Sequence, residues 1–230
     1  MLKYFSEVPA TEEAFTNNLA AIRRAIEDDF SFALSERDAS FLELVYTAFK
    51  DEGLNIQYRS GTGNSGGPQW AGFPTFRELV LETDLHGKLG SFLASEEDYN
   101  FVRDLQRRNR IIPVVGNFAG AKALSAVADY LKKNGYTVSA FYTSNVEQYL
   151  FANSTFGAFV ENIRKLPINE RSLFIRAFPN MREPHPARIS GHRLTTLLQK
   201  MTIFLQDYDK NLYQQYWDLV TTHYIAADEP

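Results

Sequence analysis

Residues 111–150 decide the fold, and they read IIPVVGNFAGAKALSAVADYLKKNGYTVSAFYTSNVEQYL. An apolar run at 111–115 is broken by a glycine turn at 116–120, and a helical pattern follows over 122–133. A second apolar and β-branched run at 137–142 begins about one crossover later. This order predicts two neighbouring parallel strands joined by a right-handed helical crossover, the arrangement that cradles phosphate groups in nucleotide-binding α/β proteins.

The tips of these two strands are where the sequence predicts a ligand site, because ligands of such sheets lie beyond the carboxyl ends of the strands. The glycines of the first tip allow close backbone approach. At the second tip, Asn145 and Glu147 carry groups that can bind a ribose, an amine or an adenine edge, and they could equally satisfy the backbone of the next helix. For Ser144 a helix-capping role is favoured over a nucleophile, since no histidine lies nearby in the sequence. The candidate site residues are Gly116, Asn117, Phe118, Gly120, Ser144, Asn145 and Glu147.

The chain before this stretch, residues 1–72, is predicted to be mostly helical and to end in a glycine-rich loop. Thr11 and Ser35 stand where helix N-caps are expected, and the second helix is expected to end at Gly53. A short strand is predicted at 54–59, where apolar and polar residues alternate.

The predicted core spans 73–178 and ends in a third strand at 172–178, whose Arg176 could point into the same cleft. The remainder, 179–230, is predicted to form a polar loop, a helix over 192–206 and an aromatic helical tail. At 230 residues, the three regions are expected to form one domain.

Composition narrows the class of protein. The chain carries a formal net charge of −4 and a pI near 5.6, so a nucleic-acid backbone is not expected as a partner. It contains no cysteine, which excludes disulfides, thiolate metal sites and cysteine nucleophiles. No stretch approaches the ~20 apolar residues that a membrane helix needs, and residues 1–10 lack the apolar core of a signal peptide. These features favour a cytoplasmic protein with no membrane partner.

Two motifs imitate known sites but lack the required chemistry. The sequence GTGNSG at 61–66 matches G-x-G-x-x-G, yet glycines and prolines follow where a dinucleotide site needs a helix, so a loop or lid is favoured. Asp207, Asp209 and Asn211 imitate the start of a calcium loop, but Leu212 stands where that loop needs glycine. The four histidines show no zinc-ligand spacing, and no metal is expected.

Four blocks of the chain carry a resemblance to a known family: FPTFREL at 73–79, GSFLASEE at 90–97, PVVGNFAG at 113–120 and SNVEQYL at 144–150. Together they resemble an uncharacterised bacterial family described as methyltransferase-like. The resemblance runs from Tyr4 to Phe178. It implies a Rossmann-like sheet of the class I methyltransferase kind, mainly parallel and flanked by helices, with S-adenosylmethionine as the cofactor and an unknown methyl acceptor.

The resemblance also implies roles for the candidate residues. The turn at 116–120 and Ser144 would hold S-adenosylmethionine or a related nucleoside, and Asn117 and Glu147 would hydrogen-bond it. Asn145 would position the acceptor atom beside Glu147, with catalysis coming mainly from alignment. Relatives generally carry aspartate where this chain has Asn117, and the chain begins after the strand with which they usually start. These two departures favour the alternative, a non-catalytic ligand-sensing or assembly module that retains the fold.

A sheet without that first strand is expected to leave an edge exposed, which natural proteins cover by pairing, charge or a packed helix. The aromatic tail over 208–225 is therefore predicted either to associate with a second copy of the chain or to fold back on its own chain. Its aromatic and apolar residues are Tyr213, Tyr216, Trp217, Tyr224 and Ile225.

Overall fold

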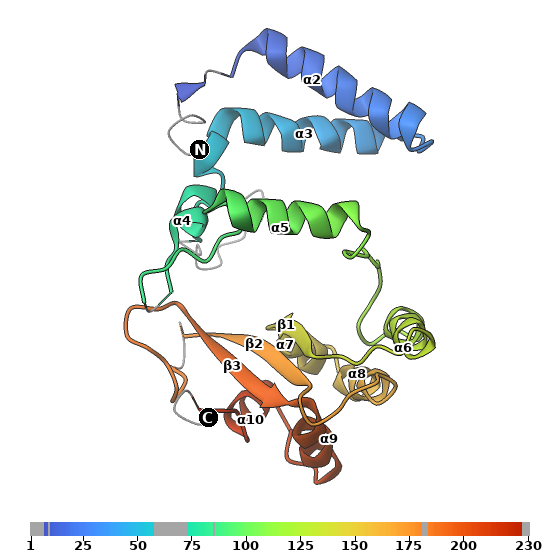
Figure 1. The fold of residues 1–230 in the computed structure, drawn as a ribbon, viewed down its shortest axis with the longest axis vertical. Coiled ribbons are helices and arrows are strands. Elements are labelled where there is room, and N and C mark those ends of the chain that lie inside the picture. The colour runs from blue at the N-terminus through green and yellow to red at the C-terminus, as the bar shows by residue number, and fades with distance from the viewer. Residues whose placement is uncertain (1–6, 9, 58–72, 85, 181–183, 227–230) are drawn as a thin grey trace. The chain divides into compact units, whose positions relative to one another are not determined.

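The computed structural model shows a mixed α/β protein (Figure 1). The chain divides into two compact units, Met1–Ile112 and Pro113–Pro230. Within the described part of the chain, the first unit is helical apart from isolated bridges, and the second holds a small sheet with helices. The structure describes residues 7–8, 10–57, 73–84, 86–180 and 184–226.

The helices of the first unit begin at the predicted caps. Thr11 Oγ1 accepts a hydrogen bond from the amide of Ala14, and Ser35 and Asp38 form a reciprocal capping box. Each cap satisfies an amide that has no partner within the helix, which stabilises the helix by about 1 kcal/mol. The elements are α2 (Glu12–Arg24), a π-helical turn (Ala25–Asp29), α3 (Glu36–Glu52), a 3₁₀ turn (Gly53–Asn55), α4 (Phe76–Leu81) and α5 (Glu96–Arg107).

Helices α2 and α3 lie side by side as a hairpin (Figure 1). The ring of Phe15 stacks on that of Tyr46 at 5.1 Å, and Leu19 is buried between the helices. Farther along, Arg23 Nη2 donates to Glu43 Oε2 at 3.0 Å. One face of α3 is therefore occupied by α2.

The second unit is built on a three-stranded sheet in the order β1 (Ala140–Ser144), β2 (Leu173–Pro179), β3 (Leu194–Lys200). Strands β1 and β2 are parallel, and β2 and β3 are antiparallel. The crossover from β1 to β2 contains α7 (Val146–Ala152) and α8 (Phe156–Ile163). The other helices are α6 (Ala123–Lys133), α9 (Met201–Asp209) and α10 (Tyr216–Thr221).

The predicted strand at 111–115 is wrong, because this segment pairs with no strand in the described part of the chain. Val115 is fully exposed, and Ile112 is 56% exposed. Pro113 removes one of the donors that a ladder needs, and an apolar run becomes a strand only where a partner completes it. The sequence predicted a parallel pair of strands on either side of α6. The structure has its parallel pair farther along the chain, between β1 and β2.

Two further predictions differ from the structure. The helix predicted over 192–206 is a strand at Leu194–Lys200, followed by α9. Burial alternates along β3, and its two threonines favour a strand, while pairing with β2 completes its hydrogen bonds. The strand predicted at 54–59 is wrong as far as Gln57: Gly53–Asn55 is a 3₁₀ turn, and Gln57 makes only an isolated bridge to Thr75. Residues 58–59 and the glycine motif at 61–66 lie outside the described residues. The third predicted strand is confirmed as β2.

Aromatic rings form the core of the second unit. Phe159 in α8 is fully buried at the centre of this cluster, and edge and offset ring contacts add to the free energy of burial. The centroid of its ring lies 6.2–6.5 Å from those of Phe118, Phe141, Phe156, Phe174 and Phe204. The turn at 116–120 is thus tied to the sheet through Phe118.

The aromatic tail packs within its own unit, and its association with a second copy of the chain stays a prediction. Trp217 contacts the ring of Phe178 at 5.3 Å, and Val220 is buried beside it. The amide of Ile225 donates to the carbonyl oxygen of Leu198 at 2.7 Å. The tail therefore covers part of the outer edge of β3.

Candidate functional site

The turn at 116–120, predicted to receive a ligand, is closed by its own hydrogen bonds. Asn117 Oδ1 accepts from the amide of Ala119 at 2.9 Å, and the amide of Gly120 donates to the carbonyl oxygen of Asn117 at 2.9 Å. From α8, Asn162 Nδ2 donates to the carbonyl oxygens of Phe118 and Gly120 at 2.9 and 2.8 Å. The amide predicted to bind a nucleoside therefore shapes the backbone of the turn.

Both glycines of this turn are explained by packing inside the protein. A Cβ added at Gly116 would lie 2.2 Å from Cβ of Ala123, the first residue of α6. At Gly120 an added Cβ would lie 3.1 Å from the carbonyl oxygen of Asn117. The sequence predicted that these glycines admit a ligand close to the backbone, which stays a prediction; the atoms that approach them in the structure belong to the chain itself.

Gly116→Ala is expected to destabilise the protein by about 1–3 kcal/mol, because α6 must shift to admit the methyl group. Urea unfolding followed by circular dichroism measures the change. Gly90→Ala is the matched control, since an added Cβ meets nothing within 4 Å there, and we expect a change within about 0.5 kcal/mol. Equal effects at the two glycines would contradict the close packing of the turn on α6.

The second predicted tip has an unusual backbone. Ser144 has a φ of 55°, a left-handed conformation that is costly for a residue with a side chain, and the pairing of β1 with β2 is irregular between Tyr142 and Ser144. The capping role predicted for Ser144 is wrong, because Asn145 occupies the N-cap of α7, without a side-chain cap bond. Ser144 and Asn145 are both half-buried.

Glu147 is fully buried and forms an ion pair with Arg176, which is also buried. Glu147 Oε1 accepts from Arg176 Nε at 2.9 Å and from Thr143 Oγ1 at 2.9 Å. The two residues come from α7 and from β2, where Arg176 is in register with Ser144. The sequence pointed to both residues as cleft groups, and the structure brings them together inside the protein.

This ion pair begins a chain of polar side chains that leads to the surface. Arg176 Nη1 donates to Gln199 Oε1 at 2.8 Å, and Gln199 Nε2 donates to the hydroxyl oxygen of Tyr213 at 3.0 Å. The hydroxyl of Tyr213 donates to Asp207 Oδ2 at 3.1 Å, which also lies 2.9 Å from Nδ1 of the largely exposed His223. Burial, and then the charge of Asp207, raise the pKa of Tyr213 well above its usual value.

Sequence reasoning missed most of this polar chain. Asp207 attracted attention as part of a calcium-like motif, whereas it serves as a buried acceptor for Tyr213. Gln199 lies in a segment predicted as helix, so its position on an inward strand face could not be foreseen. The signal that could have identified Gln199 was a polar residue directly after the apolar pair Leu197 and Leu198.

Three buried polar atoms beside the ion pair have no hydrogen-bond partner among the described residues: Glu147 Oε2, Arg176 Nη2 and the hydroxyl oxygen of Tyr216. Burial raises the pKa of Tyr216 above its usual value, and the charge of Glu147 raises it further. The Tyr216 hydroxyl, at the start of α10, is therefore held as a neutral group within electrostatic range of the carboxylate.

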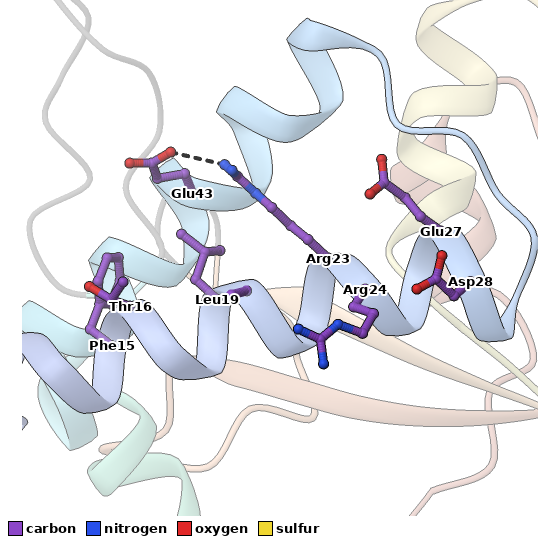
Figure 2. A pocket seen from close by; sticks show the side chains of 9 residues that line it. Phe15, Thr16, Leu19, Arg23, Arg24, Glu27, Asp28 and Glu43 are labelled. Carbon is purple, nitrogen blue, oxygen red and sulfur yellow. Dashed lines mark hydrogen bonds and ion pairs between the residues drawn. The ribbon is translucent and has the colours of Figure 1, made fainter.

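Two cavities lie in the first unit, and residues of the predicted tips do not line them. The larger, about 580 Å³, lies along α2 and reaches α3, with carboxylates and arginines around an apolar floor (Figure 2). In Figure 2, Arg23 extends across to Glu43, and the π-helical turn supplies Glu27 and Asp28. The smaller cavity, about 330 Å³, is lined by residues of 84–92 and of α5. The described residues contain no cluster of three or more side chains suited to a metal ion.

The fold is that of a mixed α/β protein, with a buried ion pair where its two parallel strands end. The chain belongs to the family described as a domain of unknown function, DUF7790, whose model matches residues 2–227. No curated protein matches the chain. Within the described ranges, no helix is both long and apolar enough to cross a membrane.

Proposed function

We propose that this chain is a non-catalytic assembly module. The observation that supports this function is the position of Glu147, which was predicted to contact a ligand and is instead fully buried against Arg176. A ligand could reach the carboxylate only if the side chains that bury it moved, and a ligand that took Oε1 would also have to separate the ion pair. Separation would leave a charge in the protein interior without its partner, at a cost of several kcal/mol.

The groups of the glycine turn support the same proposal. The side chain of Asn117 and the carbonyl oxygens of Phe118 and Gly120 already accept hydrogen bonds from within the chain. A nucleoside would compete with these bonds for the same acceptors. The turn is suited to holding α6 and α8 in place.

A second candidate, a methyltransferase-like protein that binds S-adenosylmethionine, is favoured by the backbone of Ser144. Left-handed residues with side chains concentrate at binding sites, and Ser144 lies at the carboxyl end of a parallel strand. In this proposal β1 and β2 belong to a Rossmann-like sheet, Ser144 and the turn at 116–120 hold the cofactor, and Asn145 positions the methyl acceptor. Glu147 would act indirectly, by fixing Arg176.

Calorimetric titration of the folded chain with S-adenosylmethionine, its demethylated product and adenosine separates the two candidates. We expect no binding heat and no thermal shift at millimolar ligand. A dissociation constant below about 100 μM, which is a binding free energy more favourable than roughly −5 kcal/mol, would overturn the non-catalytic proposal. In that case Asn145→Ala and Gly120→Val should weaken binding at least tenfold, while the control Asn153→Ala, at an exposed residue after α7, should not.

A further inference from the structure

The ion pair of Glu147 and Arg176 forms one of the two hydrogen bonds that an arginine and a carboxylate can share. Arg176 Nε donates to Glu147 Oε1 at 2.9 Å, and Arg176 Nη1 donates to Gln199 Oε1 at 2.8 Å. Nε and Nη2 carry hydrogens along the same edge of the guanidinium group, the edge that faces both carboxylate oxygens in a bidentate pair. Glu147 Oε2 and Arg176 Nη2 are therefore left over on the same side of the pair. Both atoms are buried and have no partner among the described residues.

The hydroxyl of Tyr216 is a third buried polar atom without a partner in the described part of the chain, and it lies beside the same pair. Tyr216 begins α10, which packs against α7, the helix that carries Glu147. Its ring stacks on that of Phe178 at a centroid distance of 6.0 Å, and Phe178 follows Arg176 by two residues in β2, so these two side chains project from the same face of the strand. Burial raises the pKa of Tyr216, the charge of Glu147 raises it further and the charge of Arg176 lowers it, so both charges act on the hydroxyl.

These three atoms match the hydrogen-bonding groups of a single neutral molecule. Arg176 Nη2 can only donate, Glu147 Oε2 can only accept, and the hydroxyl of Tyr216 can do both. A water molecule can accept from Nη2, donate to Oε2 and form a third hydrogen bond with Tyr216, and about three is the usual number for water in a protein interior. The carboxylate would repel an anion and the guanidinium group would repel a cation, so the charges of the pair favour a neutral occupant.

We propose that Glu147, Arg176 and Tyr216 form a binding site for one internal water molecule, which bridges Oε2, Nη2 and the tyrosine hydroxyl. The site goes beyond the proposed assembly function and does not depend on it, because its three residues lie inside the second unit. The water links α10 to α7 and to β2. It therefore adds a polar attachment for the aromatic tail to the apolar contact between Trp217 and Phe178.

A crystal structure of the full chain at a resolution that shows ordered waters tests the site directly. We expect an oxygen atom within hydrogen-bond distance, about 2.7–3.2 Å, of Glu147 Oε2, Arg176 Nη2 and the hydroxyl of Tyr216. A direct hydrogen bond between Nη2 and Oε2 would overturn the proposal. So would well-ordered side chains with no density bridging them.

Oxygen-17 relaxation dispersion of the solvent is a second test, because its amplitude reports water molecules that the protein holds for longer than it takes to tumble. Tyr216→Phe removes one of the three hydrogen bonds, so the residence time of the water should fall at least tenfold and the amplitude should decrease. Tyr208→Phe is the matched control. Tyr208 packs against the same core, and its hydroxyl makes no hydrogen bond to a described residue, so this variant should keep the amplitude of the parent chain.

Circular dichroism shows whether both variants keep the fold of the parent chain. A folded Tyr216→Phe chain with the full dispersion amplitude would mean that the hydroxyl does not hold the water, and the proposal would fail. An equal decrease in Tyr208→Phe would also overturn it, since the effect would then not belong to this site. The crystal structure of the parent chain needs no variant, so it decides the proposal if Tyr216→Phe does not fold.

Discussion

Arg176→Met is expected to lower the free energy of unfolding by about 3–5 kcal/mol. Methionine fills a similar volume but leaves the fully buried Glu147 carboxylate without its cationic partner. Gln199 Oε1 loses its donor as well. Urea unfolding followed by circular dichroism measures the loss.

The size of this effect separates a buried pair from a surface pair. Arg164 pairs with Glu161 and Asp209 but remains a third exposed, so Arg164→Met should cost below about 1 kcal/mol. Replacing both members of the buried pair, Glu147→Leu with Arg176→Met, should recover most of the loss, because no isolated charge remains. An Arg176→Met protein as stable as the parent would contradict the buried ion pair.

Local signals in the sequence correctly predicted helices α2 and α3 of the first unit. Thr11 and Ser35 cap the helices that follow them, and α3 ends at Gly53, which takes a positive φ. Such features depend on residues within one turn of each other, so they can be read from the sequence without knowing the fold. The sequence did not reveal which side of α3 would be covered, since that depends on a helix elsewhere in the chain.

The errors in the second unit have a different origin. The segment 111–115 has the composition of a strand, and β3 was predicted as a helix. Strand formation depends on pairing with residues that are distant in sequence, and β3 is defined by its antiparallel register with β2. Composition alone could not show that 111–115 stays unpaired and that 194–200 forms a strand.

The candidate site shows the same limit. The sequence predicted that Glu147 and Arg176 lie near one strand end, and the structure places them in contact. Whether such a pair faces a ligand or the protein interior depends on what covers it. Here the aromatic tail contributes Tyr213 and Tyr216 to the surrounding layer, and the spacing of residues within one element contains no information about this packing.

Phe159→Ala is expected to lower the stability of the second unit by about 3–5 kcal/mol. The ring is fully buried among five other phenylalanines, so its removal leaves a cavity that rigid neighbours fill poorly. It also releases Phe118, through which the turn at 116–120 packs on the sheet. The effect should exceed that of Gly116→Ala.

Hydrogen exchange measures where this loss falls along the chain. Because the chain divides into two compact units, amides of α8, β1 and β2 should exchange faster in Phe159→Ala, while those of α2 and α3 should keep their rates. Tyr149→Ala is the control, since Tyr149 in α7 is 61% exposed and should change stability by less than about 1 kcal/mol. Faster exchange throughout both units would show that they unfold together, so that the loss of one core ring destabilises the whole chain.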